Sequence, residues 1–175
     1  MGNLDTFKID LKGLKADEAH YEFRLDNACF DAIDSEEIKG GDVVVTLQMR
    51  KIAQHFELDF HTEGVVTVVC DLCLDDMSLP INTDNKMVVR LGDTYEETDE
   101  YLTIPADEGI LDVAWLVYEF IALAVPMRHV HEDGNCNPDM LQRISQLSAS
   151  SEEGGEVAED PRWNELKKLK SIIKE

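Results

Sequence analysis

The stretch that decides how this chain folds is Gly64-Val-Val-Thr-Val-Val-Cys70-Asp-Leu-Cys73-Leu-Asp-Asp-Met-Ser-Leu-Pro-Ile81. Two apolar, β-branched segments flank a C-x2-C pair, so the pattern predicts two strands joined by a tight turn that carries Cys70 and Cys73. Two thiols at this spacing can bind one metal ion from a single turn. A tetrahedral site then needs two more ligands from elsewhere in the chain.

A second group of metal-binding residue types lies far downstream, in His129-Val-His131-Glu-Asp-Gly-Asn-Cys136. We expect His131 and Cys136 to be the third and fourth ligands, with His129 as the alternative imidazole. Zinc is the expected ion, because it accepts both thiolate sulfur and imidazole nitrogen. The 57 residues between Cys73 and His131 are no obstacle if the end of a strand and the end of a helix converge.

Two other interpretations of these residues stay open. The Cys70/Cys73 pair could serve a metal- or thiol-dependent enzyme, although redox pairs usually lie at a helix N-terminus and the acids around this turn disfavour a thiolate. Alternatively, the cysteines are small buried apolar residues, the interpretation that we adopt for the isolated Cys29. Four protein ligands would close the coordination shell, and the sequence has no phosphate loop, G-x-S-x-G or H-E-x-x-H motif, so the site is not expected to be catalytic.

The rest of the chain predicts an α+β fold. Runs with alternating or β-branched residues predict strands that form an antiparallel β meander or a partly closed barrel. A short strand is expected at 101–104, within the acidic segment 92–108. The longer predicted strands are His20–Leu25, Val43–Met49, His55–Phe60 and Lys86–Leu91.

The second half of the chain predicts helices. The apolar run that ends at Pro126 predicts one buried helix at about 110–125, with Trp115 in the core. This run spans roughly 24 Å as a helix, which is too short for a membrane core of about 30 Å. The polar residues 148–160 predict a flexible acidic linker. Asp160-Pro161 and the apolar stripe that follows predict an amphipathic C-terminal helix at about 161–173. We therefore expect a single α+β domain at residues 1–147, followed by the linker and by the C-terminal helical segment 161–175.

The composition restricts the class of partner. The 175 residues carry 37 acids against 16 bases, a net charge of −21, and residues 92–108 hold seven acids without a Lys or Arg. Such a surface repels phosphate backbones, so direct binding to bare nucleic acid is not expected. It attracts basic proteins, unless the acids serve only solubility. The opening residues lack the apolar region of a signal peptide, so we expect a reducing cytoplasm, where clustered cysteines favour metal sites over disulfides.

The chain contains a set of short motifs: Cys70-Asp-Leu-Cys73-Leu, Leu111-Asp112, Leu123-Ala-Val-Pro126, His131, Cys136 and Asp160-Pro-Arg-Trp163. Taken together, these motifs resemble the YceD family, the large ribosomal RNA subunit accumulation proteins. The resemblance implies a non-enzymatic factor that supports normal amounts of large-subunit ribosomal RNA. With the charge, it leads us to expect a basic ribosomal protein or an assembly intermediate as the partner. Some members carry more cysteines after the proline, where this chain has His129, His131 and one cysteine, Cys136.

Overall fold

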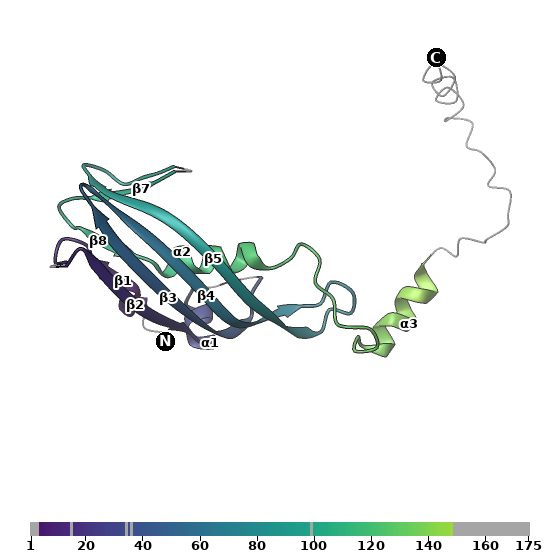
Figure 1. Ribbon diagram of the computed structural model, residues 1–175. Coiled ribbons are helices and arrows are strands. Elements are labelled where there is room, and N and C mark those ends of the chain that lie inside the picture. Colours follow the sequence, from purple (N-terminus) through teal and green to yellow (C-terminus); the bar gives the residue numbers. More distant parts are fainter. Residues whose placement is uncertain (1–3, 15, 34, 36, 99, 149–175) are drawn as a thin grey trace, which may run out of the picture. The chain divides into compact units, whose positions relative to one another are not determined.

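A long antiparallel sheet forms the body of the protein in the computed structural model (Figure 1). The structure describes residues 4–14, 16–33, 35, 37–98 and 100–148. The chain divides into two units, residues 1–141 and 142–175, and the sheets lie in the first. In chain order the elements are the 3-10 helix η1 (Leu4–Phe7), β1 (Lys8–Asp10), β2 (Glu18–Leu25), α1 (Asn27–Ile33), β3 (Gly40–Ile52), β4 (His55–Val69), β5 (Asp76–Gly92), β6 (Glu96–Glu97), β7 (Leu102–Pro105), β8 (Ile110–Asp112), α2 (Ala114–Ala124) and α3 (Pro138–Leu147).

The sheet order in the described residues is β2-β3-β4-β5-β7-β6. Strands β2 to β5 follow one another in sequence and pair antiparallel, whereas β7 joins β5 in parallel. The register of β4 against β5 runs without interruption from His55 opposite Arg90 to Val69 opposite Asp76. This unbroken pairing brings the end of β4 and the start of β5 together, with only residues 70–75 between them.

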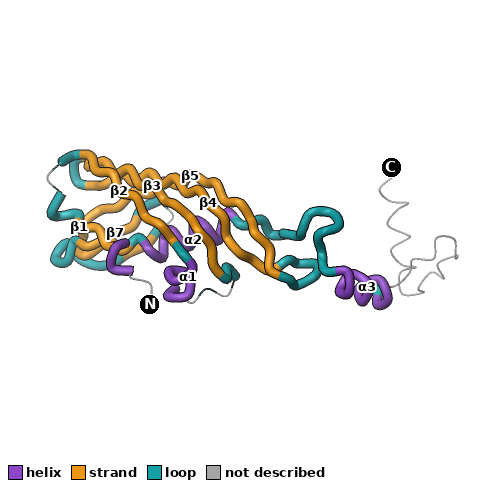
Figure 2. Tube along the Cα trace, turned by 90° about the horizontal axis from the view of Figure 1, so that it is seen from below, coloured by secondary structure: helices purple, strands orange, loops and turns teal. Residues whose placement is uncertain are grey.

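One face of this sheet is apolar because the side chains alternate along each strand. Val43, Val45 and Leu47 of β3 are buried on this face, and the alternating residues of β4 continue it. Helices α1 and α2 lie against the sheet, as the view in Figure 2 shows. The ring of Phe120 on α2 meets that of Phe60 on β4 edge to face, with 5.3 Å between their centroids.

The N-terminal segment also packs into the core through Phe7, Ile9 and Leu11, which are all buried. Strand β1 pairs with β8, which places Ile9 opposite Leu111 in a small second sheet. Phe7 stacks on Phe23 of β2, with 5.2 Å between the ring centroids. Strand β8 leads directly into α2, so this pairing fixes the position at which the helix begins.

The α+β class, the antiparallel meander and the four long strands predicted from the sequence are confirmed. Among the described residues the large sheet remains open and does not close into a barrel. Helices α1 and α3 were not predicted. The expected linker and C-terminal helix lie outside the described residues apart from Ser148, and the boundary of the single domain at residue 147 stays a prediction.

The buried helix differs from expectation at its start and on its outer side. Residues 110–112 form β8 instead of the first helical turn, and the Asp112 side chain accepts a hydrogen bond from the Ala114 N–H at 3.0 Å. The prediction that Trp115 belongs to the core was wrong, because this side chain is 56% exposed. No helix in the described part of the chain is long and apolar enough to cross a membrane.

Candidate metal centre

The cysteine turn is closed by its own main chain. The Cys70 N–H donates to the Asp75 carbonyl at 2.9 Å, and the Leu74 N–H donates to the Cys70 carbonyl at 3.0 Å. Leu74 takes a left-handed conformation, with a φ of 63°, to complete the turn. Cys70 and Cys73 are both buried, so the tip of the β4–β5 hairpin holds two thiols in a fixed position out of solvent.

Main-chain donors surround the sulfur of Cys70. Burial by itself raises the pKa of this thiol, but hydrogen bonds from the N–H groups of Cys73, Leu72 and His131 outweigh burial and lower the pKa to about 6. The sequence had suggested that the neighbouring acids disfavour a thiolate. The turn overcomes them with amide donors, which stabilise the charged form directly.

The segment after α2 reaches this turn through Asp71. The Asp71 N–H donates to the His129 carbonyl at 2.9 Å, and the Asp71 carboxylate accepts the His129 N–H at 2.7 Å. The imidazole of His129 contacts the Pro126 carbonyl through Nδ1 at 3.0 Å and has Nε2 3.8 Å from the Asp71 carboxylate. His129 therefore holds the returning chain against the turn, two residues before His131.

Four ligand atoms converge where the two segments meet. The Nδ1 of His131 lies 3.3 Å from the sulfur of Cys73 and 3.9 Å from that of Cys136. The sulfurs of Cys70 and Cys136 are 3.9 Å apart, and all four atoms lie within 4.8 Å of one another. The described cysteines are all free thiols, so no disulfide competes for these atoms.

These separations fit one tetrahedral ion. Bonds of about 2.3 Å to sulfur and about 2.0 Å to nitrogen, at tetrahedral angles, place the ligand atoms about 3.5–3.8 Å apart. The observed contacts of 3.3–3.9 Å lie around this range. Three thiolates and one imidazole would complete the shell, which is the arrangement of a structural site. Zinc held there would supply a cross-link between the hairpin and the segment after α2.

The protonation of the cluster is consistent with shared binding of a cation. A hydrogen bond to Cys70 raises the pKa of His131, against the effect of burial. Burial and the hydrogen bond to Cys70 raise the pKa of the Cys136 thiol to about 11. A divalent ion bound by these residues would displace the protons that the ligand atoms carry.

The comparison with protein families identifies the chain. The family model described as Large ribosomal RNA subunit accumulation protein YceD matches residues 58–170, which is more than half of the sequence. The chain belongs to the YceD family. The match includes both halves of the cluster and runs from strand β4 past the end of α3. Searches of curated proteins and of solved structures gave no match.

The structure of this YceD protein brings together Cys70, Cys73, His131 and Cys136, the four residues that the sequence predicted as metal ligands. It places the alternative ligand His129 outside the group, in contact with Asp71 and Pro126. Cys29 lies apart from the cluster on α1, with its sulfur 4.0 Å from the Arg24 carbonyl.

Sequence reasoning missed the side chains that tether the two segments of this YceD site. Besides Asp71, the amide of Asn137 donates to the Asp75 carboxylate at 3.0 Å. The other end of the Asn137 side chain caps α3, because its oxygen accepts the Asp139 N–H at 3.1 Å. The dipeptide Asn137-Pro138 is a helix-start signal and would have revealed this cap. No local signal marks Asp71 as the anchor for His129.

Proposed function

We propose that this protein is a non-enzymatic factor that supports accumulation of large-subunit ribosomal RNA during ribosome assembly in the cytoplasm, and that it holds a structural zinc ion. The YceD match is the observation that carries the proposal. The family description names the RNA whose amount depends on such proteins, and the matched region contains the whole Cys3His cluster.

The structural role of zinc is supported by what the cluster connects. Two ligands come from the tip of the β4–β5 hairpin, and two come from the segment between α2 and α3. Within residues 127–137 no aliphatic or aromatic residue is buried, so this segment has little apolar area to hold it in place. An ion shared by the two segments would supply the missing stability.

The class of partner follows from charge. The net charge of −21 opposes contact with the phosphates of RNA and favours contact with basic protein. Strand β6 and its surroundings add exposed acids at one end of the sheet, including Glu96 and Glu97. We therefore propose a basic ribosomal protein, free or within an assembly intermediate, as the partner.

Binding to two purified probes tests this proposal. The zinc-loaded chain is mixed either with bare large-subunit ribosomal RNA or with proteins extracted from purified large subunits, at low and at physiological salt. We expect retention of extracted protein and little retention of RNA at physiological salt. Tight binding of bare RNA at that salt, with no protein retained, would show that the partner class is wrong.

A thiol enzyme is the second candidate function, and the lowered pKa of Cys70 favours it. The two functions differ in what the second pair of ligands does. A redox dithiol needs only Cys70 and Cys73, whereas a structural ion also needs His131 and Cys136. Replacing Cys136 with serine should loosen the metal if the site is structural, and should leave thiol–disulfide exchange by the first pair intact if the site is a dithiol.

A further inference from the structure

Helix α2 has an uncovered apolar side. Trp115 is 56% exposed and Leu123 is 81% exposed, although both lie on a helix whose opposite side packs against the sheet. Trp115, Glu119 and Ala122 follow one another at helical spacing along this outer side, and only Glu119 among them is charged. Large apolar side chains that stay exposed on one side of a core helix mark a surface that is suited to a partner.

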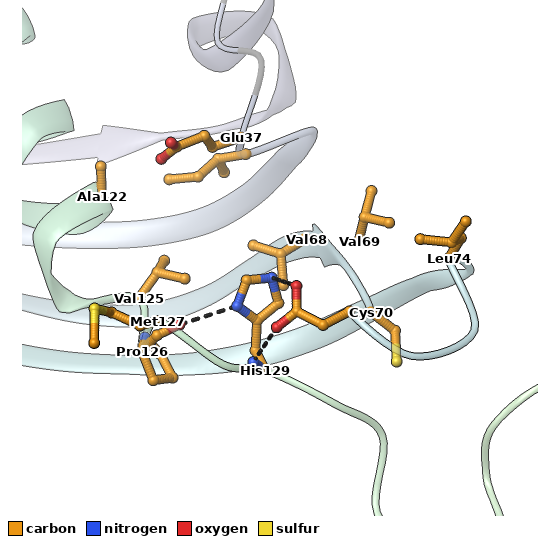
Figure 3. A pocket seen from close by; sticks show the side chains of 12 residues that line it. Glu37, Val68, Val69, Cys70, Leu74, Ala122, Val125, Pro126, Met127 and His129 are labelled. Carbon is orange, nitrogen blue, oxygen red and sulfur yellow. Dashed lines mark hydrogen bonds and ion pairs between the residues drawn. The ribbon is translucent and has the colours of Figure 1, made fainter. Parts of the chain in front are cut away.

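A cavity lies at the C-terminal end of the same face (Figure 3). Its volume is about 500 Å³, which is large enough for several side chains of a partner. Ala122 and Met127 contribute from the helix end, Ile38 from the segment before β3, and Val68 and Leu74 from the hairpin. The buried metal-ligand candidate Cys70 also lines the cavity, so the cysteine turn forms part of its wall.

The conformation and exposure of Leu74 indicate that this cavity binds a partner. Its φ of 63° is a conformation that glycine adopts freely and that costs a leucine side chain about 1–2 kcal/mol. Despite this, the position carries a large apolar side chain that is 62% exposed and makes part of the cavity lining. An exposed leucine held in a strained turn is more readily explained by a contact with a partner than by packing within the chain.

The charges at the cavity favour a basic occupant. Glu37 and Asp71 line it, and no Lys or Arg is among its described lining residues. Asp71 is engaged with His129, whereas the carboxylate of Glu37 is exposed at the cavity. A lysine or arginine beside an apolar anchor would thus meet a carboxylate, and the net charge of −21 would speed its approach.

We propose that this cavity and the adjoining outer side of α2 are the docking surface for a basic protein segment. A large apolar side chain of the partner enters the cavity between Ala122 and Leu74, and a neighbouring cation faces Glu37. This inference rests on the proposed function and adds the surface through which a basic ribosomal protein binds. Because Cys70 and Asp71 form one wall, an ion held by the Cys3His cluster would fix the position of this wall.

The test uses the full zinc-loaded chain and proteins extracted from purified large ribosomal subunits as the probe. Ala122→Trp places a bulky ring in the cavity beside Leu74, and we expect it to reduce retention of the extracted proteins about tenfold, as for loss of one apolar hot spot. Leu74→Gly removes an apolar wall while relieving the strained φ, so it should reduce retention with a melting temperature that is unchanged or higher. That result separates loss of binding from loss of folding.

A matched pair of charge reversals tests the electrostatic part. Glu37→Lys alters the cavity, and Glu22→Lys makes the same change of net charge on the outer face of β2. We expect retention to fall several-fold with Glu37→Lys and to stay near that of the original chain with Glu22→Lys. Equal losses in the two variants would mean that overall charge alone attracts the partner, which would overturn the assigned surface.

The remaining outcomes separate the surface from the proposed function. If the original chain retains large-subunit proteins and Ala122→Trp retains them equally, the surface is wrong while the proposed function stands. If the original chain retains none of them, the proposed partner class fails as well. If the original chain sediments as a dimer and Ala122→Trp as a monomer, a second copy occupies the face and the proposal is overturned.

Discussion

The sheet core and the cysteine–histidine end of this protein are held together by different forces. In the core, Val45, Leu47 and their neighbours on β4 bury apolar area along two long strands. The stabilising free energy is therefore distributed over many apolar contacts. At the other end, residues 127–137 contain no buried aliphatic or aromatic residue and are held by Asp71, Asn137 and the ligand cluster. The core can therefore fold by burial alone, whereas the far end depends on a few directional contacts and an ion.

Of the changes considered, removal of the metal should lower the stability of the folded protein most, and it should do so at the cysteine–histidine end. At a metal concentration about 1,000 times the dissociation constant, the bound ion stabilises the folded state by about 4 kcal/mol. For a chain of this size, its loss lowers the melting temperature by about 8–16 °C. Calorimetry with and without a chelator measures the shift, and Cys70→Ser should reproduce it.

Hydrogen exchange of the backbone amides identifies the residues that lose protection when the metal is removed. We expect amides in residues 127–137 to exchange rapidly once the ion is removed, while those of β3 and β4 remain protected. Loss of protection throughout the sheet would mean that the core also depends on the ion. An unchanged pattern would mean that the segment is held without it.

A substitution in the sheet core should lower the stability of the fold without affecting the metal end. Leu47→Ala removes a fully buried side chain from β3 and should lower the free energy of unfolding by about 2–5 kcal/mol. The metal content per chain should not change. Val44→Ala on the solvent face of the same strand is the control, and we expect a change within about 0.5 kcal/mol. Denaturant unfolding and metal analysis of both variants check the prediction.

Asp71→Ala should have a smaller effect, confined to the metal end. The change removes the carboxylate that accepts the His129 N–H and should cost about 1 kcal/mol. Because this contact positions the segment that carries His131, metal affinity should fall about fivefold. Competition with a metal indicator measures the affinity, and Asp93→Ala serves as a control for the loss of one charge. Equal affinities for the two variants would show that the tether is not needed.

The smallest effect is expected at an exposed ion pair of the sheet. Arg24 contacts Asp42 at 2.7 Å, and this hydrogen bond lowers the pKa of the Asp42 carboxyl. The stabilisation is therefore present above the unfolded pKa of about 3.9 and is lost as the pH falls through the lowered folded-state pKa. Arg24→Ala should change the melting temperature slightly at neutral pH and not at all in strong acid. A large change at neutral pH would contradict the view that burial dominates the core.

The sequence predicted the core better than the metal end because strand patterns are local. Alternation in His55–Phe60 and the β-branched run Val43–Met49 identified the strands that pair in the structure. Residues 110–112 were assigned to the helix, because no local pattern shows that β1 pairs with them as β8. The exposure of Trp115 was missed for a related reason, since an apolar helix does not reveal which of its sides is covered.

At the metal end, residue chemistry identified the four cluster members, and their spacing within each pair made convergence plausible. What brings the pairs together is non-local. Asp71 binds the main chain of His129, a residue 58 positions away. The spacing of residues within either segment does not predict such a contact. The role of His129 was unclear from the sequence for this reason, and the fold assigns it to the tether.

The most direct test of the central claim is X-ray absorption at the zinc edge, combined with the metal content of the purified chain. The account predicts one zinc per chain, with three sulfurs at about 2.3 Å and one nitrogen at about 2.0 Å. Cys70→Ser, Cys136→Ser and His131→Ala should each weaken binding, and Cys29→Ala should not. A chain that folds fully without metal, or a bound ion whose ligands survive all three substitutions, would contradict the account.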